Sequence, residues 1–214
     1  MSPGDEGYRR RSRHTSLDER HGGLDAWLDA IVYYGLGQHL LLAVPVLWIA
    51  FQAVTTPVAV TTSAIVALSV ASLTIGAFRM GVISVGVPWR RIEDNDLGLG
   101  PTGGYGFFAR RAAYLNATLG LGTFAGALAD TAGGLGSAIL VAGGFTLGSL
   151  LVLPHIRGAS GTRTLVRALY YGVSLSVIAV GGQVLDLSVG APSAVVAFGL
   201  ICLFVIVDIG LDVR

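Results

Sequence analysis

From residue 31 onwards, the chain alternates between long apolar runs and short polar segments. Six of these runs approach the ~20 consecutive apolar residues that a helix needs to cross the hydrocarbon core of a bilayer. None of them carries the charged stripe, repeated at helical spacing, that marks the solvent face of a soluble helix. We therefore predict an all-α polytopic integral membrane protein, a bundle of six transmembrane helices over residues 31–54, 58–78, 112–129, 135–153, 165–185 and 194–209.

The composition favours the same environment. Of 214 residues, 53% are hydrophobic and 13% are charged, and the mean hydropathy is +0.70. Soluble domains contain about 25% charged residues, so a soluble fold of this size would have too few charges to cover its surface. The expected first partner of the chain is the lipid bilayer.

The arginines predict an orientation. They precede the first run, lie between the second and third runs, lie between or beside the fourth and fifth, and end the chain, whereas the alternate loops contain none. Basic loops stay on the cytoplasmic side of a membrane. We therefore expect a cell-membrane protein with both termini cytoplasmic. Its polar residues 1–25 should form a disordered cytoplasmic tail, its membrane domain should span residues 26–214, and residues 81–110 should form a cytoplasmic loop.

An internal repeat is visible in the second half of the chain. A shift of 56 residues places Arg111 on Arg167 and Tyr114 on Tyr170. Both segments then continue in the same order, with a glycine, an acidic turn and a second helix rich in small residues. This predicts a bundle built from repeated helical hairpins in one orientation, unlike the inverted repeats of many secondary transporters.

Three polar residues fall inside the apolar runs. His39 lies about eight residues into the first run, roughly 12 Å deep at ~1.5 Å per residue, and Asn116 and Asp208 lie in the same half of the membrane. Ionisable groups at such depth are candidates for function. They are our candidates for a substrate or ion path; the more common role of such residues is a hydrogen bond between helices or a position at the membrane interface.

Two Arg–Tyr pairs begin the third and fifth runs. Arg111 with Tyr114, and Arg167 with Tyr170, share the i,i+3 spacing that places both side chains on one helix face. Snorkelling arginines and interfacial tyrosines commonly anchor helices at the lipid interface. We expect these four residues to be lipid-interface anchors, with binding of anionic lipid headgroups as the sharper alternative.

Glycine accounts for 31 residues. The pairs Gly122–Gly126 and Gly144–Gly148 have the small-xxx-small spacing that lets membrane helices approach closely. They predict packing within the chain, with a homo-oligomer face as the alternative.

No sequence feature indicates catalysis, a metal or another cofactor. Cys202 is the single cysteine, so the chain offers no thiolate cluster, and there is no nucleotide loop or zinc-binding spacing. Ala109-Arg110 with Gly126-xxx-Asp130 matches only part of the CDP-alcohol phosphatidyltransferase pattern, and residues 158–161 match the rhomboid serine motif without a later histidine. The basic residues lack the clustering of a nucleic-acid interface.

Two functions remain open from the sequence. A small transporter or channel for an ion or small solute predicts that His39, Asn116 and Asp208 converge on a hydrated cavity. A non-catalytic scaffold or accessory subunit, with a membrane protein partner, predicts a closed bundle whose small-residue faces point outward. A lipid-modifying enzyme ranks third, because no acid, base or metal constellation supports it.

Overall fold

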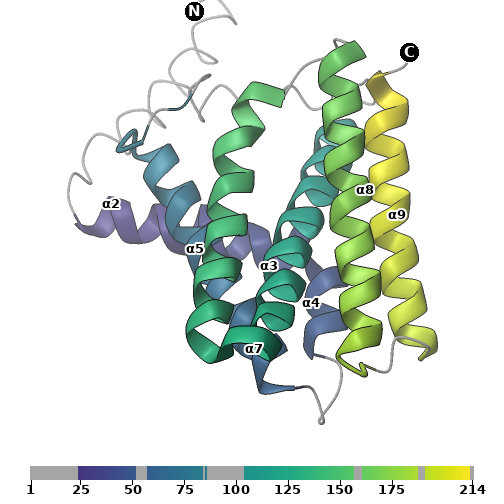
Figure 1. Ribbon diagram of the computed structural model, residues 1–214. Helices are drawn as coiled ribbons and strands as arrows, with labels where there is room; N and C mark the ends of the chain where they lie inside the picture. Colours follow the sequence, from purple (N-terminus) through teal and green to yellow (C-terminus); the bar gives the residue numbers. More distant parts are fainter. Residues whose placement is uncertain are drawn as a thin grey trace, which may run out of the picture.

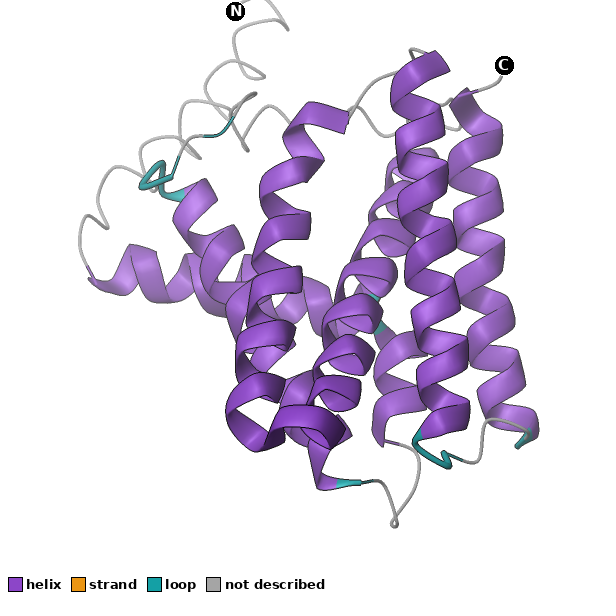
Figure 2. Cartoon of the chain, viewed as in Figure 1, coloured by secondary structure: helices purple, strands orange, loops and turns teal. Residues whose placement is uncertain are grey.

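The computed structural model describes residues 24–51, 57–83, 85, 104–156, 161–187 and 191–212. All regular structure within these ranges is helical (Figures 1 and 2). The elements are α2 (Leu24–Asp29), the π-helix η1 (Ala30–Gly37), α3 (Gln38–Leu42), α4 (Val44–Phe51), α5 (Val58–Arg79), α7 (Gly104–Ile156), α8 (Gly161–Val184) and α9 (Pro192–Asp212). The predicted tail, apart from its last two residues, and most of the predicted 81–110 loop lie outside the described residues.

Helix α7 folds back on itself at Gly134. This residue has φ 70° and ψ −170°, outside the helical region, and glycine adopts a positive φ without steric cost. Ser137 Oγ closes the turn by donating to the carbonyl oxygens of Ala129 and Gly134, each at 2.7 Å. The residues before the turn, 104–133, are called the central limb here, and residues 135–156 the second limb. They correspond to the third and fourth predicted runs, but the central limb begins at Gly104 rather than near residue 112.

The central limb is the axis of the bundle. Every residue from Ala112 to Phe124 is buried. The other helices surround it: α3, α4, α5, α8 and α9 all pack against α7, and α5 makes the most extensive contact. A helix that is apolar and buried on all sides can satisfy a polar side chain only through other protein atoms. The partners of its polar residues are therefore informative.

The first predicted run, 31–54, is not one straight helix. The segments on either side of Ala43 are bent by 72°, and Figure 1 shows α2 running across the direction of the other helices. Ala43 has φ −101° and ψ 15°, and Pro45 has no N–H to donate to the carbonyl of Leu41. Sharp kinks generally have such a cause. Residues 24–42 on the near side of the bend are called the arm.

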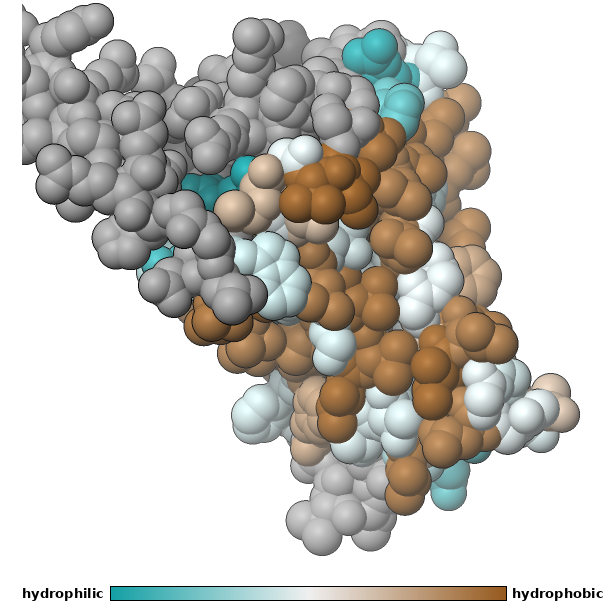
Figure 3. Space-filling model, turned by 90° about the vertical axis from the view of Figure 1, so that its left-hand side faces the viewer, coloured by the Kyte–Doolittle hydropathy of each residue, from teal (hydrophilic) through white to brown (hydrophobic). Residues whose placement is uncertain are grey.

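The outer surface of the described residues is apolar. Leu41, Leu140 and Ile206 are 70%, 76% and 66% exposed, and hydrophobic side chains cover most of the coloured surface in Figure 3. Four helices are long and apolar enough to cross a membrane, or five if the bent arm and α4 form one crossing. The fold is that of a helical bundle compatible with insertion in a bilayer.

Candidate functional site

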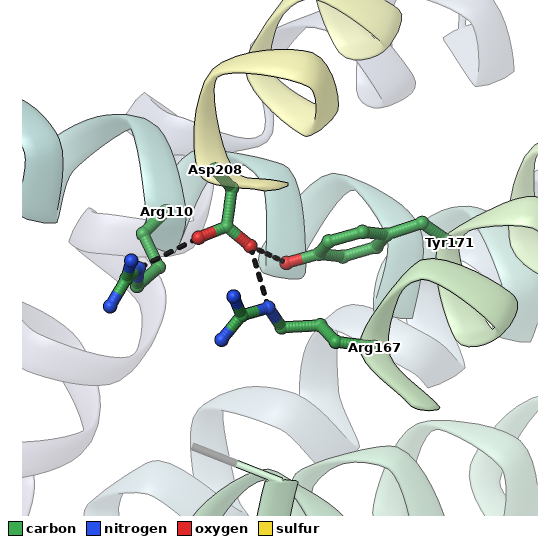
Figure 4. Close-up of polar contacts among 4 residues, drawn as sticks. All are labelled: Arg110, Arg167, Tyr171 and Asp208. Carbon is green, nitrogen blue, oxygen red and sulfur yellow. Dashed lines mark hydrogen bonds and ion pairs between the residues drawn. The ribbon is translucent and has the colours of Figure 1, made fainter. Parts of the chain in front are cut away.

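An ion cluster joins three helices where α7 and α8 begin and α9 ends (Figure 4). Asp208 of α9 is fully buried, and its Oδ1 accepts a hydrogen bond from Arg110 Nε at 2.7 Å. Its Oδ2 accepts a hydrogen bond from the hydroxyl of Tyr171 at 2.6 Å. Arg167 Nε lies 3.1 Å from the same Oδ2, without the alignment of a hydrogen bond, so this contact is an ion pair.

The cluster lies mostly inside the protein. The side chains of Arg167 and Asp208 are 2% and 0% exposed, whereas that of Arg110 is 23% exposed. A carboxylate buried in this way is stable only when it is paired and hydrogen-bonded. Arg110 therefore connects the buried carboxylate of Asp208 to the surface at this end of the bundle, which is called the arginine end here.

Three tyrosines pack next to the ion cluster. The ring centroids of Tyr114 and Tyr170 are 5.3 Å apart in a stacked arrangement, and Tyr171 lies 6.5 Å from Tyr114 and 5.9 Å from Tyr170. The Tyr114 hydroxyl donates to the carbonyl oxygen of Ser149 on the second limb. The Tyr170 hydroxyl and Thr118 Oγ1 are 2.9 Å apart. Each phenol thus keeps its apolar ring in the core and has a polar partner.

These contacts follow one line along the central limb. Its members are spaced four residues apart and are called the polar line: Arg110, Tyr114, Thr118, Gly122 and Gly126. Four residues of an α-helix turn through about 400°, so each step rotates the line by about 40°. This rotation accompanies a change of neighbour, from α9 at Arg110, to α8 and the second limb at Tyr114, and to the second limb and α5 at Gly122. The line is about 24 Å long at ~1.5 Å per residue.

Hydroxyl groups continue the polar line at its glycine end. A Cβ atom at Gly122 would collide with Thr146 Oγ1 of the second limb, and one at Gly126 would lie 2.8 Å from Ser63 Oγ of α5. The hydroxyls of Thr146 and Ser63 are buried and have no hydrogen-bond partner in the part of the chain that the structure describes. Glycine at these two positions lets neighbouring polar groups reach the axis of the bundle.

Asn116 occupies the bend between α3 and α4. Its Oδ1 accepts a hydrogen bond from the Val46 N–H at 3.0 Å, and its Nδ2 donates to the Leu42 carbonyl at 2.9 Å. Nδ2 also donates to the carbonyl of Ala112 at 2.8 Å. Val46 and Leu42 are four residues apart, so the amide bridges the two groups that a continuous α-helix would join directly.

His39 lies on the arm, one turn before the bend. It is fully buried, and its Nδ1 is 2.5 Å from the carbonyl oxygen of Gly35. A carbonyl oxygen can only accept, so Nδ1 carries the proton and, in a neutral ring, Nε2 is an acceptor. This Nε2 has no hydrogen-bond partner within the described ranges. His39 therefore presents a buried acceptor in the arm.

The three predicted path residues are all buried, but each has its own partners. Asp208 belongs to the ion cluster, Asn116 to the bend and His39 to the arm. The structure therefore places them at three locations around the central limb, and the convergence on one cavity that the sequence led us to expect for a transporter is not seen among the described residues.

Two of the four predicted interface anchors, Tyr114 and Arg167, have their side chains inside the bundle. Tyr114 and Arg167 are 3% and 2% exposed and bond to protein atoms inside the bundle. Tyr170 is partly buried, between Tyr114 and Thr118, and Arg111 is partly buried beside Arg110. Both side chains find polar partners in the interior: the backbone of the second limb for Tyr114, and the buried carboxylate of Asp208 for Arg167.

Arg110, Tyr171 and the hydroxyls around the polar line were not predicted as site residues. The four-residue spacing of Arg110, Tyr114 and Thr118 would have indicated one face of a helix. Tyr171 lies one turn after Arg167 on the buried face of α8, and its spacing from Arg167 would have distinguished it from Tyr170.

The described residues contain no group of three or more His, Cys, Asp or Glu side chains that could hold a metal ion. What the site offers is a series of hydrogen-bonding groups along the axis of an apolar bundle, with charge at one end. Such groups can transfer a proton or bind a small polar species.

Fold and site together define an all-helical, membrane-type bundle with a polar axis. A family model described as a domain of unknown function (DUF8215) matches residues 21–160, more than half of the chain, and the protein belongs to this family. The match covers the arm, α4, α5 and α7, whereas α8 and α9 lie beyond it. No curated protein and no solved structure matches the chain.

Proposed function

We propose that the protein is a small transporter or channel that passes an ion or a small polar solute along the central limb. The polar line is the observation that supports this proposal. It is about 24 Å long, and the hydrocarbon core of a bilayer is ~30 Å thick, so the line would reach across most of that core. Burying polar groups in a membrane bundle costs free energy, so such groups usually either join helices or line a path. The three polar side chains of the line and the buried hydroxyls of Thr146 and Ser63 beside its glycines support a path.

The chemistry of the line favours a small species. Beyond the ion cluster, the described polar side chains on or beside the line all carry hydroxyls: Tyr114, Tyr170, Thr118, Thr146 and Ser63. Hydroxyls both donate and accept, which suits a proton, a water-sized solute or a partly hydrated ion. Passage requires the two limbs of α7 to separate, because they touch at Gly122 and Gly126.

The topology proposed for this function has six crossings and cytoplasmic termini. The reversal at Gly134 supports two crossings for α7, the bent arm with α4 supports one, and α5, α8 and α9 add one each. The cluster of Arg110 and Arg167 at one end supports that end as the cytoplasmic one. Anionic lipid headgroups are proposed partners there.

Stacking of Tyr114 on Tyr170 supports the internal duplication. The 56-residue shift pairs these two residues, and they face each other across the contact between α7 and α8. Equivalent residues meet in this way when two copies are related by a twofold rotation. We propose that α7 and the α8–α9 pair are two copies of one hairpin.

Flux measurements test the proposed function. Purified protein in liposomes is subjected to gradients of protons, Na⁺, K⁺ and small polar solutes. Thr118→Val should lower the rate of the transported species roughly fivefold, because it removes one hydrogen bond of about 1 kcal/mol from the path. The control is Ser176→Ala, whose exposed hydroxyl donates only to Gly172 of its own helix. Rates equal to those of empty liposomes for every gradient would contradict the proposal.

A scaffold or accessory subunit is the second candidate. Gly144 and Gly148 lie on the exposed side of the second limb, and a Cβ atom at either would meet nothing within 4 Å. Small exposed residues at this spacing allow another helix to approach closely. Native mass spectrometry of the solubilised protein distinguishes the two functions: a stoichiometric second protein that is lost in Gly144→Leu would support the scaffold.

A further inference from the structure

We propose that the first membrane segment is a hinge, and that the side chain of Asn116 is its latch. The bend of 72° separates the arm from α4, and Asn116 holds the two ends of the broken helix apart. The hinge is a property of the fold and holds whichever solute or partner the protein has.

Asn116 replaces one backbone hydrogen bond with two. In the bent state, the Val46 N–H and the Leu42 carbonyl both bond to the amide, at 3.0 Å and 2.9 Å. If the amide leaves, these same two groups can bond to each other, because they have the i and i−4 positions of an α-helix. Neither backbone group then remains buried without a partner, so the straighter state loses no backbone hydrogen bond at this turn. The Asn116 amide keeps its bond to the Ala112 carbonyl and loses its other two partners, which favours the bent state.

Pro45 biases the hinge toward the bent state. It cannot donate to the carbonyl of Leu41, and its ring crowds that carbonyl in a continuous helix. The straighter state therefore retains a proline kink. The first segment thus contains two devices, Pro45 and Asn116, that oppose a continuous helix at the same turn.

The arm also carries buried polar atoms that lack partners in the bent state. His39 Nε2 and Gln38 Oε1 have no hydrogen-bond partner among the described residues. Unsatisfied groups of this kind destabilise the conformation that contains them. Two neighbouring ones on the moving side of the hinge reduce the energy gap to a second arrangement of the arm.

Glycines bring the arm and α5 close together. A Cβ atom at Gly35 would lie 2.6 Å from the carbonyl oxygen of Ser72, and one at Gly76 would lie 2.6 Å from Ile31 Cγ1. The two helices therefore meet with backbone close to backbone at Gly35, and with the Ile31 side chain seated on Gly76. The arm is roughly 27 Å long at ~1.5 Å per residue, so a change of half the bend moves its far end by on the order of 15 Å.

Distances between spin labels test the hinge in the full-length protein in lipid nanodiscs. One label is attached to the exposed arm at Tyr33→Cys and the other to the exposed second limb at Leu140→Cys, with Cys202→Ser removing the native thiol. Asn116→Ala, Asn116→Asp and Pro45→Ala are compared in this background. Ser174→Ala is the matched control, because Ser174 is equally buried but donates only within its own helix.

The hinge predicts that Asn116→Ala and Pro45→Ala each shift the mean distance by at least 5 Å, about one helical turn, or add a second population. Asn116→Asp, which keeps the acceptor for Val46 and loses the donor to Leu42, should give an intermediate mixture. Ser174→Ala should retain the parent distribution. Unchanged distances in all three hinge variants would overturn the proposal. Loss of folding in both Asn116 variants would also overturn it, since Asn116 would then be a fixed structural bond.

Discussion

At the scale of single residues, the buried carboxylate of Asp208 joins three helices. It accepts from Arg110 of α7 and from Tyr171 of α8, and it is paired with Arg167 of α8. A charge that is buried among protein atoms is held by its partners rather than by water. Removing the carboxylate leaves two guanidinium groups close together at the start of α7 and α8.

Asp208→Asn should destabilise the protein by about 3–5 kcal/mol, the usual result of removing one partner of a buried ion pair. The measurement is thermal unfolding in detergent, followed by circular dichroism. Asp186→Asn is the control, because Asp186 is exposed at the end of α8 with φ 51°, a conformation that asparagine adopts well. Equal melting temperatures for the two variants would show that the ion cluster contributes little.

At the scale of the elements, glycine positions determine how closely the limbs of α7 approach. Gly126 faces the second limb, where a Cβ atom would lie 2.7 Å from Ala142 Cβ and 2.9 Å from the Ala138 carbonyl oxygen. Gly144 faces outward, with nothing within 4 Å. Two residues of the same type in one helical hairpin therefore have opposite roles, one in internal packing and one at the outer surface.

Gly126→Ala should destabilise the fold by about 1–3 kcal/mol, as overpacking of a tight contact does. Gly144→Ala should be neutral or stabilising by up to about 1 kcal/mol, because alanine is the better helix former and has room. Paired thermal unfolding of the two variants checks this difference. A larger loss of stability in Gly144→Ala than in Gly126→Ala would contradict the arrangement of the limbs.

The sequence predicted an all-helical fold, and the described regular structure is all helical, because long hydrophobic segments are strong local signals. It predicted neither the bend at Ala43 nor the partners of Asn116. Pro45 is a local signal for the bend that the prediction of one run over 31–54 did not use. The bonds of Asn116 to Val46 and Leu42 join residues 70 and 74 positions apart, which no local pattern indicates. Tyr114 and Arg167 were expected at the lipid interface because the spacing of an arginine and a tyrosine on one helix face is the same for interface anchors and for buried residues that bond to other protein groups. Only the position of Asp208 in the fold distinguishes a buried partner from a lipid headgroup.

At the scale of the whole molecule, the central limb lies within the segment matched by the family model and joins the rest of that segment to α8 and α9. Asn116 joins it to the arm and α4, and Arg110 joins it to α9. A helix buried on every side transmits displacement between the elements around it, because close-packed interiors yield little. Movement at the hinge would thus displace the central limb and, with it, the side chains of the polar line.

The orientation of the whole molecule is tested with reporter fusions. The six-crossing proposal places a fusion after residue 55 or 188 outside the cytoplasm and a fusion after Arg214 inside, because the arginine-bearing loops remain cytoplasmic. Alkaline phosphatase and fluorescent-protein activities at the three positions provide the measurement. A C-terminal fusion active as phosphatase would contradict the proposed orientation.

The most direct test of the central claim is whether water reaches the polar line. In a Cys202→Ser background, Ser63→Cys, Thr118→Cys and Thr146→Cys each replace a hydroxyl with a thiol of similar size, and a small methanethiosulfonate reagent is added to the protein in liposomes. Thr123→Cys is the control, since Thr123 is 2% exposed on the same central limb but lies off the line. The account predicts that position 118 on the line and positions 63 and 146 beside it react faster than position 123. Equal, negligible reaction at all four positions would show a dry axis and contradict the proposed path.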